Sequence, residues 1–403
     1  MNRKFFLIVL LSFPSALAGS SQSSDFYLLS SQVRIRLLTE LKPEYILFSV
    51  SSGKYIIEDG SDTIINVTSG ENVILACYDG KIAVKIRGVR VFAVDSLLFK
   101  GVTGDDNFSL RIDTGESVLR NYTGDLQCFP DLGTILLINS FDIDKYVAGV
   151  VNAEGGNGKN EEYFRTQAVI ARTYTYKYFN KHSIDRYNLC DGTHCQAFNG
   201  ITQDSVINNA VIHTKDLVIT TADSNLIISA FHSNCGGETS PSEYVWLTGQ
   251  PYLTKVIDPY CLSSRNATWG KIISLTEWTD WLKRNGYKDT AQDASVFNFE
   301  QTTRVPDYKA GSFTLPLRVF RTGLGLRSSF FSVSVEGDSL RLRGRGYGHG
   351  VGLCQEGAMV MSMKGFTYQQ IIDFYYSGVL IMDIKNAVLL PPDPTPKSTK
   401  GGF

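Results

Sequence analysis

The chain has 403 residues, of which 43% are hydrophobic and 20% charged, and its formal net charge is -1. This length predicts two domains or one large elaborated domain, with enough apolar sequence for a packed core. The balanced charge argues against a dominant nucleic-acid-binding surface, because no basic excess is present to neutralise phosphates.

The N-terminus is typical of a secretory signal peptide over residues 1–18. Arg3 and Lys4 form a basic segment, residues 5–11 are apolar, and residues 16–18 form a small-residue cleavage signal. A retained anchor is the alternative, but the apolar stretch is short for a membrane span, as is every later one. We therefore expect an exported protein of the periplasm, extracellular space or cell wall, without a stable membrane span in its mature form.

Residues 24–125 alternate short β-like runs with turns rich in Gly, Ser and Asp, which predicts a small all-β domain. It contains no concentrated group of His, Asp or Glu, and we interpret it as positioning or binding. Residues 126–385 mix strands with several helices, and the Pro- and Lys-rich residues 386–403 are expected to be disordered. The predicted fold class is therefore α+β, a mixed β-rich catalytic domain preceded by a small all-β domain.

Two predicted helices surround Glu154. Asp142 or Ser140 can cap the first helix, which follows the β-like run GTILLINS, and glycines from Gly155 onward end it. Asn160 is the expected cap of the second helix. The first, apolar helix thus places a single carboxylate, that of Glu154, at the start of a Gly/Asn-rich loop.

The remaining elements lie further along the chain. Residues 211–231 have a strand pattern, and residues 265–335 resemble an insertion with a helix in LTEWTDWLKRNG. A strand then enters a glycine-rich turn followed by two helices. Gly365 ends the first of these, and Thr367 with Gln370 forms a capping box for the second.

Five motifs carry a family resemblance: YVAGVVNAEGGN…YFRTQAVIARTYTY, CQAFNG, AFHSNCGGETSPSEYVW, PYLTKVIDPYC and GRGYGHGVGLCQEGAMVMSMKGFTYQQIIDFYYSG. Together they resemble the sporulation stage II protein D / LytB (SpoIID/LytB) family, secreted bacterial proteins that act on peptidoglycan glycan strands. The resemblance covers residues 125–382 except the insertion. It implies either a lytic transglycosylase or an amidase enhancer.

Glu154 matches the family's catalytic glutamate, although the family usually has Met where Gly155 stands. A single carboxyl can protonate the glycosidic oxygen and then deprotonate the sugar's own C6 hydroxyl, unlike the paired carboxylates of ordinary glycosidases. Such an acid needs a raised pKa near neutral pH, hence an apolar or crowded setting. The alternative is a helix-terminal glutamate that faces water.

The resemblance also implies substrate-binding positions at Gln167, Arg172, His232, Ser233, Gly236, Gly237, His349 and Gln355. Arg172 could pair with Glu154, hold a sugar substituent, or form a structural salt bridge. His232 could contact substrate or be a buried, hydrogen-bonded histidine. The glycine-rich turn around His349 lacks the Lys-Ser/Thr of a phosphate-binding loop, which excludes that class. The family usually has Ser at Cys354, so this thiol is expected to be incidental; a cysteine nucleophile with His349 as base is the sharper alternative.

Seven cysteines in an exported chain permit disulfides and leave at least one unpaired. The favoured pair is Cys235 with Cys261. Cys190, His194 and Cys195 form a candidate zinc site, to which His182 could add a fourth ligand, and some family members hold zinc near this position. A local disulfide and separate buried thiols are the alternatives. Zinc is the only cofactor predicted.

The leading hypothesis is an exported murein lytic transglycosylase that cleaves the MurNAc–GlcNAc bond to a 1,6-anhydro product. Its expected partners are peptidoglycan glycan strands and a cell-wall amidase. No nucleic-acid partner is expected. The main rival is a non-catalytic, glycan-binding activator of that amidase. A metal-dependent hydrolase is disfavoured because the chain has no HExxH-like ligand pair.

Overall fold

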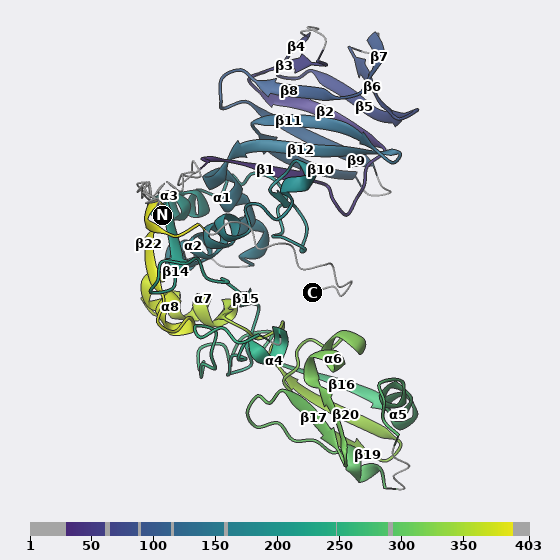
Figure 1. The fold of residues 1–403 in the computed structure, drawn as a ribbon, viewed down its shortest axis with the longest axis vertical. Coiled ribbons are helices and arrows are strands. Elements are labelled where there is room, and N and C mark those ends of the chain that lie inside the picture. Colours follow the sequence, from purple (N-terminus) through teal and green to yellow (C-terminus); the bar gives the residue numbers. More distant parts are fainter. Residues whose placement is uncertain are drawn as a thin grey trace, which may run out of the picture. The chain divides into compact units, whose positions relative to one another are not determined.

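Figure 1 shows the computed structural model of the chain, which describes residues 30–60, 65–87, 90–113, 117–156, 160–246, 248–288 and 293–389. The predicted signal peptide and residues 390–403 of the predicted disordered tail lie outside these ranges. The described residues from Ser31 onward form one compact unit that combines helices with several sheets, which confirms the predicted α+β class. Among the helices of the described part, none is long and apolar enough to cross a membrane.

The N-terminal part is built from two sheets. The seven-stranded sheet has the order β13 (Leu189–Cys190), β1 (Gln32–Leu37), β12 (Thr134–Asp142), β11 (Asp125–Asp131), β8 (Leu97–Gly101), β3 (Lys54–Glu58) and β4 (Ile65–Thr68). The six-stranded sheet has the order β10 (Ser117–Thr123), β9 (Asn107–Asp113), β2 (Tyr45–Ser52), β5 (Asn72–Tyr78), β6 (Lys81–Ile86) and β7 (Arg90–Val94). Phe48 of β2 stacks on Phe99 of β8 at 4.1 Å between ring centroids, so the apolar faces of the two sheets pack together.

The all-β region does not end at residue 125 as the pattern suggests. Both β11 and β12 belong to the seven-stranded sheet, where β12 pairs antiparallel with β1 along its whole length. The inward side chains of β12, Ile135 and Leu137 among them, are buried in the same core. The sheet therefore continues to Asp142, where the first helix begins.

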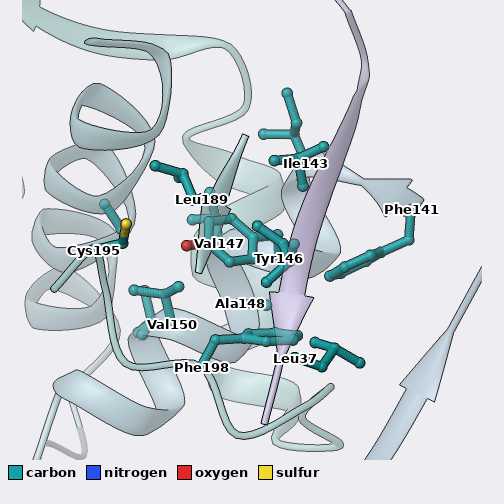
Figure 2. Close-up of a cluster of buried hydrophobic side chains, with 14 of the residues drawn as sticks. Leu37, Phe141, Ile143, Tyr146, Val147, Ala148, Val150, Leu189, Cys195 and Phe198 are labelled. Carbon is teal, nitrogen blue, oxygen red and sulfur yellow. The ribbon is translucent and has the colours of Figure 1, made fainter. Parts of the chain in front are cut away.

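The helices that follow begin at the predicted caps. Asp142 caps α1 (Ile143–Glu154), and Asn160 caps α2 (Glu161–Lys177). After α7 (Gln355–Met363), the predicted capping box of Thr367 and Gln370 begins α8 (Tyr368–Tyr375). Figure 2 shows buried side chains of α1, with Tyr146, Val147 and Val150 among them, in one cluster with Leu37 of β1.

The helix before β14 (Leu217–Thr220) differs from the predicted pattern. Residues 211–213, expected as strand, form the end of α3 (Ser205–His213), which Asp204 caps. The strand begins only at β14, which pairs with β22 (Leu380–Asp383). The short strands β15 (Phe231–His232) and β21 (Leu353–Cys354) pair in parallel.

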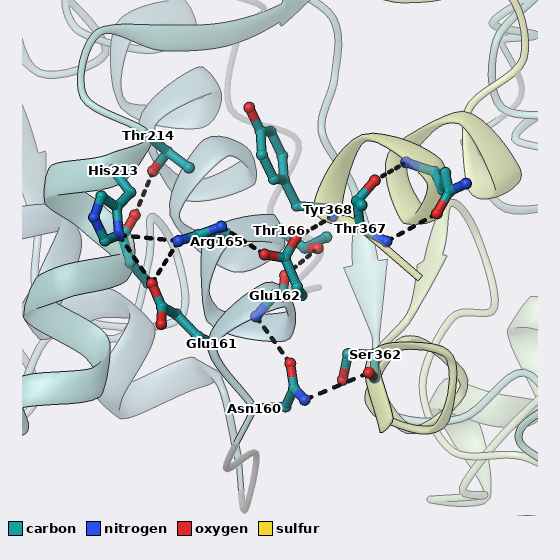
Figure 3. A network of polar contacts seen from close by, with 12 residues as sticks. Asn160, Glu161, Glu162, Arg165, Thr166, His213, Thr214, Ser362, Thr367 and Tyr368 are labelled. Carbon is teal, nitrogen blue, oxygen red and sulfur yellow. Dashed lines mark hydrogen bonds and ion pairs between the residues drawn. The ribbon is translucent and has the colours of Figure 1, made fainter. Parts of the chain in front are cut away.

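A polar network joins the start of α2 to the C-terminal helices (Figure 3). The Glu162 carboxylate accepts a bond from the Tyr368 peptide N–H at 2.7 Å and pairs with Arg165 at 2.6 Å. Asn160 donates through Nδ2 to the Ser362 carbonyl at 3.4 Å. The start of α2 and the segment between α7 and α8, which are about 200 residues apart in the sequence, are therefore in direct contact.

The predicted insertion has a hydrophobic core of its own, which includes Trp278 and Phe320. Its elements are β16 (Thr268–Ser274), α5 (Leu275–Arg284), β17 (Asp307–Ala310), β18 (Phe313–Pro316), α6 (Leu317–Gly323), β19 (Phe331–Glu336) and β20 (Ser339–Arg345). The α5 helix matches the predicted one. The insertion extends beyond residue 335, because β20 pairs with both β16 and β19 before the chain enters the glycine-rich turn.

Candidate active site

Glu154 is the last residue of α1 and is half-buried. Its Oε1 accepts a hydrogen bond from the Ala197 peptide N–H at 2.7 Å, and its carbonyl oxygen accepts one from Gln355 Nε2 at 2.7 Å. Residues from two distant segments thus fix the end of α1. Gln355 contacts the catalytic candidate's backbone here, which makes it a positioning residue.

Burial raises the pKa of Glu154, and the Ala197 N–H opposes this only in part. Glu154 makes no ion pair within the described ranges. No charged neighbour contributes to the shift, so desolvation alone favours the protonated form. This is the direction that a general acid requires.

Close packing fixes the loop that carries Ala197. A Cβ on Gly149 of α1 would lie 2.3 Å from the Phe198 ring and 2.5 Å from the Gly200 carbonyl oxygen, so only glycine permits this approach. The Phe198 ring also lies 5.2 Å from that of Tyr146, as Figure 2 illustrates. The peptide N–H at Ala197 is therefore held rigidly against Glu154.

The predicted metal ligands come together in the same loop region. One ligand atom from each of His182, Cys190, His194 and Cys195 lies within 4.8 Å of all the others. Cys195 Sγ is 3.4 Å from His182 Nε2, and both Cys190 and Cys195 Sγ are 3.8 Å from His194 Nδ1. The two thiols are not joined as a disulfide, and hydrogen bonding with Cys195 lowers the pKa of Cys190. Two thiols and two imidazoles form the donor set of a closed, four-ligand zinc site.

Arg172 is buried where α1, α2 and α3 meet. The side chain is 1% exposed and pairs with Asp144 at 2.9 Å, while Nη1 donates to the Thr214 carbonyl at 2.7 Å. This is the structural salt bridge among the alternatives, and it joins α1, α2 and α3. Gln167 is likewise buried within α2. Both side chains are buried, and the substrate-binding roles implied for them stay predictions.

His232 and His349 lie beside each other, with ring centroids 5.5 Å apart. His232 is buried and donates through Nδ1 to the Val351 carbonyl at 3.1 Å, and its Nε2 has no protein partner among the described residues. His349 is half-buried, and its Nδ1 accepts from the Val351 N–H at 3.0 Å. Burial lowers the pKa of His232, and lowers that of His349 to about 4, so both rings are neutral at pH 7.

The glycines near His232 serve contacts within the chain. Gly236 has a φ of +72°, and a Cβ there would lie 2.8 Å from the Gly346 nitrogen. Gly237, with φ +97°, would meet Leu262 at 2.9 Å. Ser233 accepts from Asn266 Nδ2 at 3.2 Å. These residues build the wall that carries His232, and the substrate-binding roles implied for them stay predictions.

Cys354 does not form a catalytic pair with His349. The thiol is fully buried and accepts a bond from the Cys235 N–H at 3.3 Å. The expected Cys235–Cys261 disulfide is not formed, although the two sulfur atoms lie 3.4 Å apart. Sequence reasoning missed Ala197 because its contribution is a peptide N–H, which carries no residue-type signal.

Residues 131–221, which contain Glu154 and all four candidate metal ligands, match the stage II sporulation protein family, SpoIID. The chain is 28% identical to stage II sporulation protein D of Bacillus subtilis over 61% of this chain and 76% of that protein. It is 27% identical to an amidase enhancer of the same organism, over 58% of this chain and 40% of that protein. An uncharacterized protein of Brachyspira hyodysenteriae is 27% identical over 89% of this chain and 96% of its own length. These matches support the SpoIID/LytB family that the motifs predict.

Proposed function

We propose that this chain is an exported cell-wall protein that cleaves peptidoglycan glycan strands as a lytic transglycosylase. The observation that supports this best is the Glu154 carboxyl, half-buried, without an ionic partner in the described part of the chain and with a raised pKa. The similarity of the chain to stage II sporulation protein D agrees with the proposed role in the cell wall.

In the proposed reaction, protonated Glu154 donates its proton to the glycosidic oxygen as the bond to C1 of MurNAc breaks. The carboxylate then accepts the proton of the C6 hydroxyl while O6 bonds to C1. The products are a free GlcNAc hydroxyl and a 1,6-anhydro end, and no water is consumed. A single carboxyl is therefore sufficient, and the N–H of Ala197 would stabilise its ionised form between the two steps.

Zinc fits the cluster in the loop region beside Glu154, which we call the first cluster. It would be held there by His182, Cys190, His194 and Cys195. Four protein ligands leave no open position, so the ion would supply structural stabilisation rather than a reactive group. Cys195 precedes Ala197 by two residues, and the bound ion would therefore keep the Ala197 N–H directed at Glu154.

A second candidate function is activation of a cell-wall amidase without cleavage of glycan, which the relationship to an amidase enhancer supports. The same fold could serve both functions, because glycan binding does not require the carboxyl to act as an acid. The two packed N-terminal sheets would then offer a binding surface for the amidase.

Incubation of the full chain with glycan strands stripped of stem peptides distinguishes the two functions. We expect 1,6-anhydro ends from the unaltered chain and none from Glu154→Gln, whose amide can still accept from Ala197. Glu336→Gln is the matched control, since this glutamate is exposed in the insertion and should leave cleavage unchanged. Glycan binding without cleavage by every variant would refute the enzymatic function and favour the activator.

A further inference from the structure

A second group of metal-binding side chains lies in the core, apart from the first cluster. One ligand atom from each of Cys235, Asp258, Cys261 and Cys354 lies within 4.8 Å of all the others. All four residues are 0% exposed. They come from three segments: the loop after β15, the loop of residues 250–264, and the junction of β21 with α7.

The spacing of the sulfur atoms fits a shared metal better than a bond between them. Cys235 Sγ lies 3.4 Å from Cys261 Sγ and 3.2 Å from Asp258 Oδ2. Zn–S bonds of about 2.3 Å in a tetrahedral site place neighbouring sulfurs about 3.8 Å apart. A disulfide would require an S–S distance of about 2.05 Å. It would also not explain why the Cys354 thiol and the Asp258 carboxylate lie in the same cluster.

The charges of the surroundings also favour a bound cation. Asp258 forms no ion pair among the residues that the structure describes, although a buried carboxylate is costly when unpaired. A buried cation, Arg304, donates to the Cys235 carbonyl at 2.8 Å and likewise has no ion-pair partner within the described ranges. A divalent ion would neutralise part of a set of three thiolates and one carboxylate, and Arg304 would offset part of the remaining negative charge.

Outer contacts already orient the four ligands. Cys354 Sγ accepts from the peptide N–H groups of Cys235 and Gly357, at 3.3 and 3.4 Å. The Tyr375 hydroxyl donates to Asp258 Oδ2 at 2.9 Å. A Cβ at Gly357 would lie 2.4 Å from that same oxygen, so glycine is needed for the carboxylate to reach the start of α7. Metal sites characteristically have such supporting hydrogen bonds to their ligands.

We propose that Cys235, Asp258, Cys261 and Cys354 form a second metal site that binds a divalent zinc-type ion. Thiolates select a soft cation over Ca²⁺ or Mg²⁺, and four protein ligands make the site closed and structural. The site would join the wall that carries His232 to α7, whose first residue, Gln355, holds the end of α1. The inference does not depend on the proposed activity.

Metal content of the full chain tests the proposal, with zinc as the probe. We compare the unaltered chain, Cys354→Ser, Cys190→Ser and Cys77→Ser by elemental analysis and by mass spectrometry under native conditions. Cys354→Ser and Cys190→Ser should each lose one equivalent of zinc, and together they should account for both ions. Cys77→Ser, outside both clusters, should lose none.

Thiol labelling of the unaltered chain guards against a variant that fails to fold. After unfolding in chelator without reductant, Cys235, Cys261 and Cys354 should all be alkylated. Labelling of Cys235 and Cys261 only after reduction would reveal a disulfide and overturn the proposal. The same conclusion follows if all three thiols are free but Cys354→Ser retains as much zinc as the control.

Discussion

Glu154 is held by two hydrogen bonds from distant segments, and its half-buried carboxyl has a raised pKa because of desolvation. At a given pH, a larger fraction of this carboxyl is protonated than for a free glutamate. Since the proposed first step uses the proton, glycan cleavage should decline as the pH rises through the pKa of Glu154. A pH–rate profile on stripped glycan strands measures this, and a rate that increases with pH over that range would contradict the assignment.

The same carboxyl predicts a stability effect. A raised pKa in the folded state means that stability is fully present below the unfolded-state pKa and is lost as the pH rises through the folded-state pKa. Glu154→Gln cannot ionise, so in urea unfolding it should become more stable relative to the unaltered chain as the pH rises. Equal pH dependence of both proteins would show that Glu154 is not desolvated.

Arg172 should stabilise the fold without contacting substrate. Arg172→Met leaves Asp144 and three carbonyl groups without their donor, and we expect a loss of about 3 kcal/mol in the free energy of unfolding. Arg341→Met removes an exposed ion pair and should change unfolding little. A stable Arg172→Met variant with weakened glycan binding would restore the substrate-binding role that the sequence implied.

At the level of elements, the contact between α1 and the Ala197 loop should control activity. Gly149→Ala would normally favour a helix, yet here the methyl group meets Phe198 and Gly200, and overpacking costs about 1–3 kcal/mol. We expect lower stability together with slower cleavage, because Ala197 moves relative to Glu154. Gly270→Ala is the control, with its nearest contact at an ordinary 3.7 Å. If Gly149→Ala is more stable than the unaltered chain, the packing argument is wrong.

Local signals explain which elements could be predicted. The caps at Asp142, Asn160 and Thr367 act within a few residues of the helices they begin, so the sequence located α1, α2 and α8. The pattern predicts strand at the end of α3 because VIHTKDLVIT runs without a break from helix into β14. The boundary at residue 125 was missed because strand pairing between β1 and β12 is a long-range property.

The two cysteine clusters show the same limit within the candidate sites. His182, Cys190, His194 and Cys195 lie within 14 residues of sequence, and that proximity pointed to a shared ion. Cys354 is 119 residues from its hydrogen-bond partner Cys235, so no spacing rule relates them. The sequence also could not show that Arg172 is buried, because a motif contains the same arginine whether its side chain faces substrate or the core.

At the level of the whole molecule, Arg304 joins the insertion to the wall that carries His232. It comes from the chain between the insertion's elements, and its peptide N–H and Nε both bond to Glu238, at 2.7 Å each. Nη2 donates to the Cys235 carbonyl, and the guanidinium lies against Gly350, where a Cβ would be 2.8 Å from its central carbon. The insertion otherwise has its own hydrophobic core, so this side chain should couple its unfolding to that of the remaining chain.

Arg304→Met should separate these two transitions. Loss of the guanidinium leaves buried carbonyl acceptors unsatisfied, at about 1–3 kcal/mol each. Trp269, Trp278 and Trp281 lie in the insertion, so tryptophan fluorescence reports mainly on this part, whereas circular dichroism reports on the whole chain. The two signals should coincide in urea unfolding of the unaltered chain and diverge in Arg304→Met, with fluorescence changing first. Arg343→Met, which removes only a bond to Ser334 within the insertion, should keep them coincident. If Arg304→Met lowers both midpoints together, cooperation between the two parts rests on contacts other than Arg304.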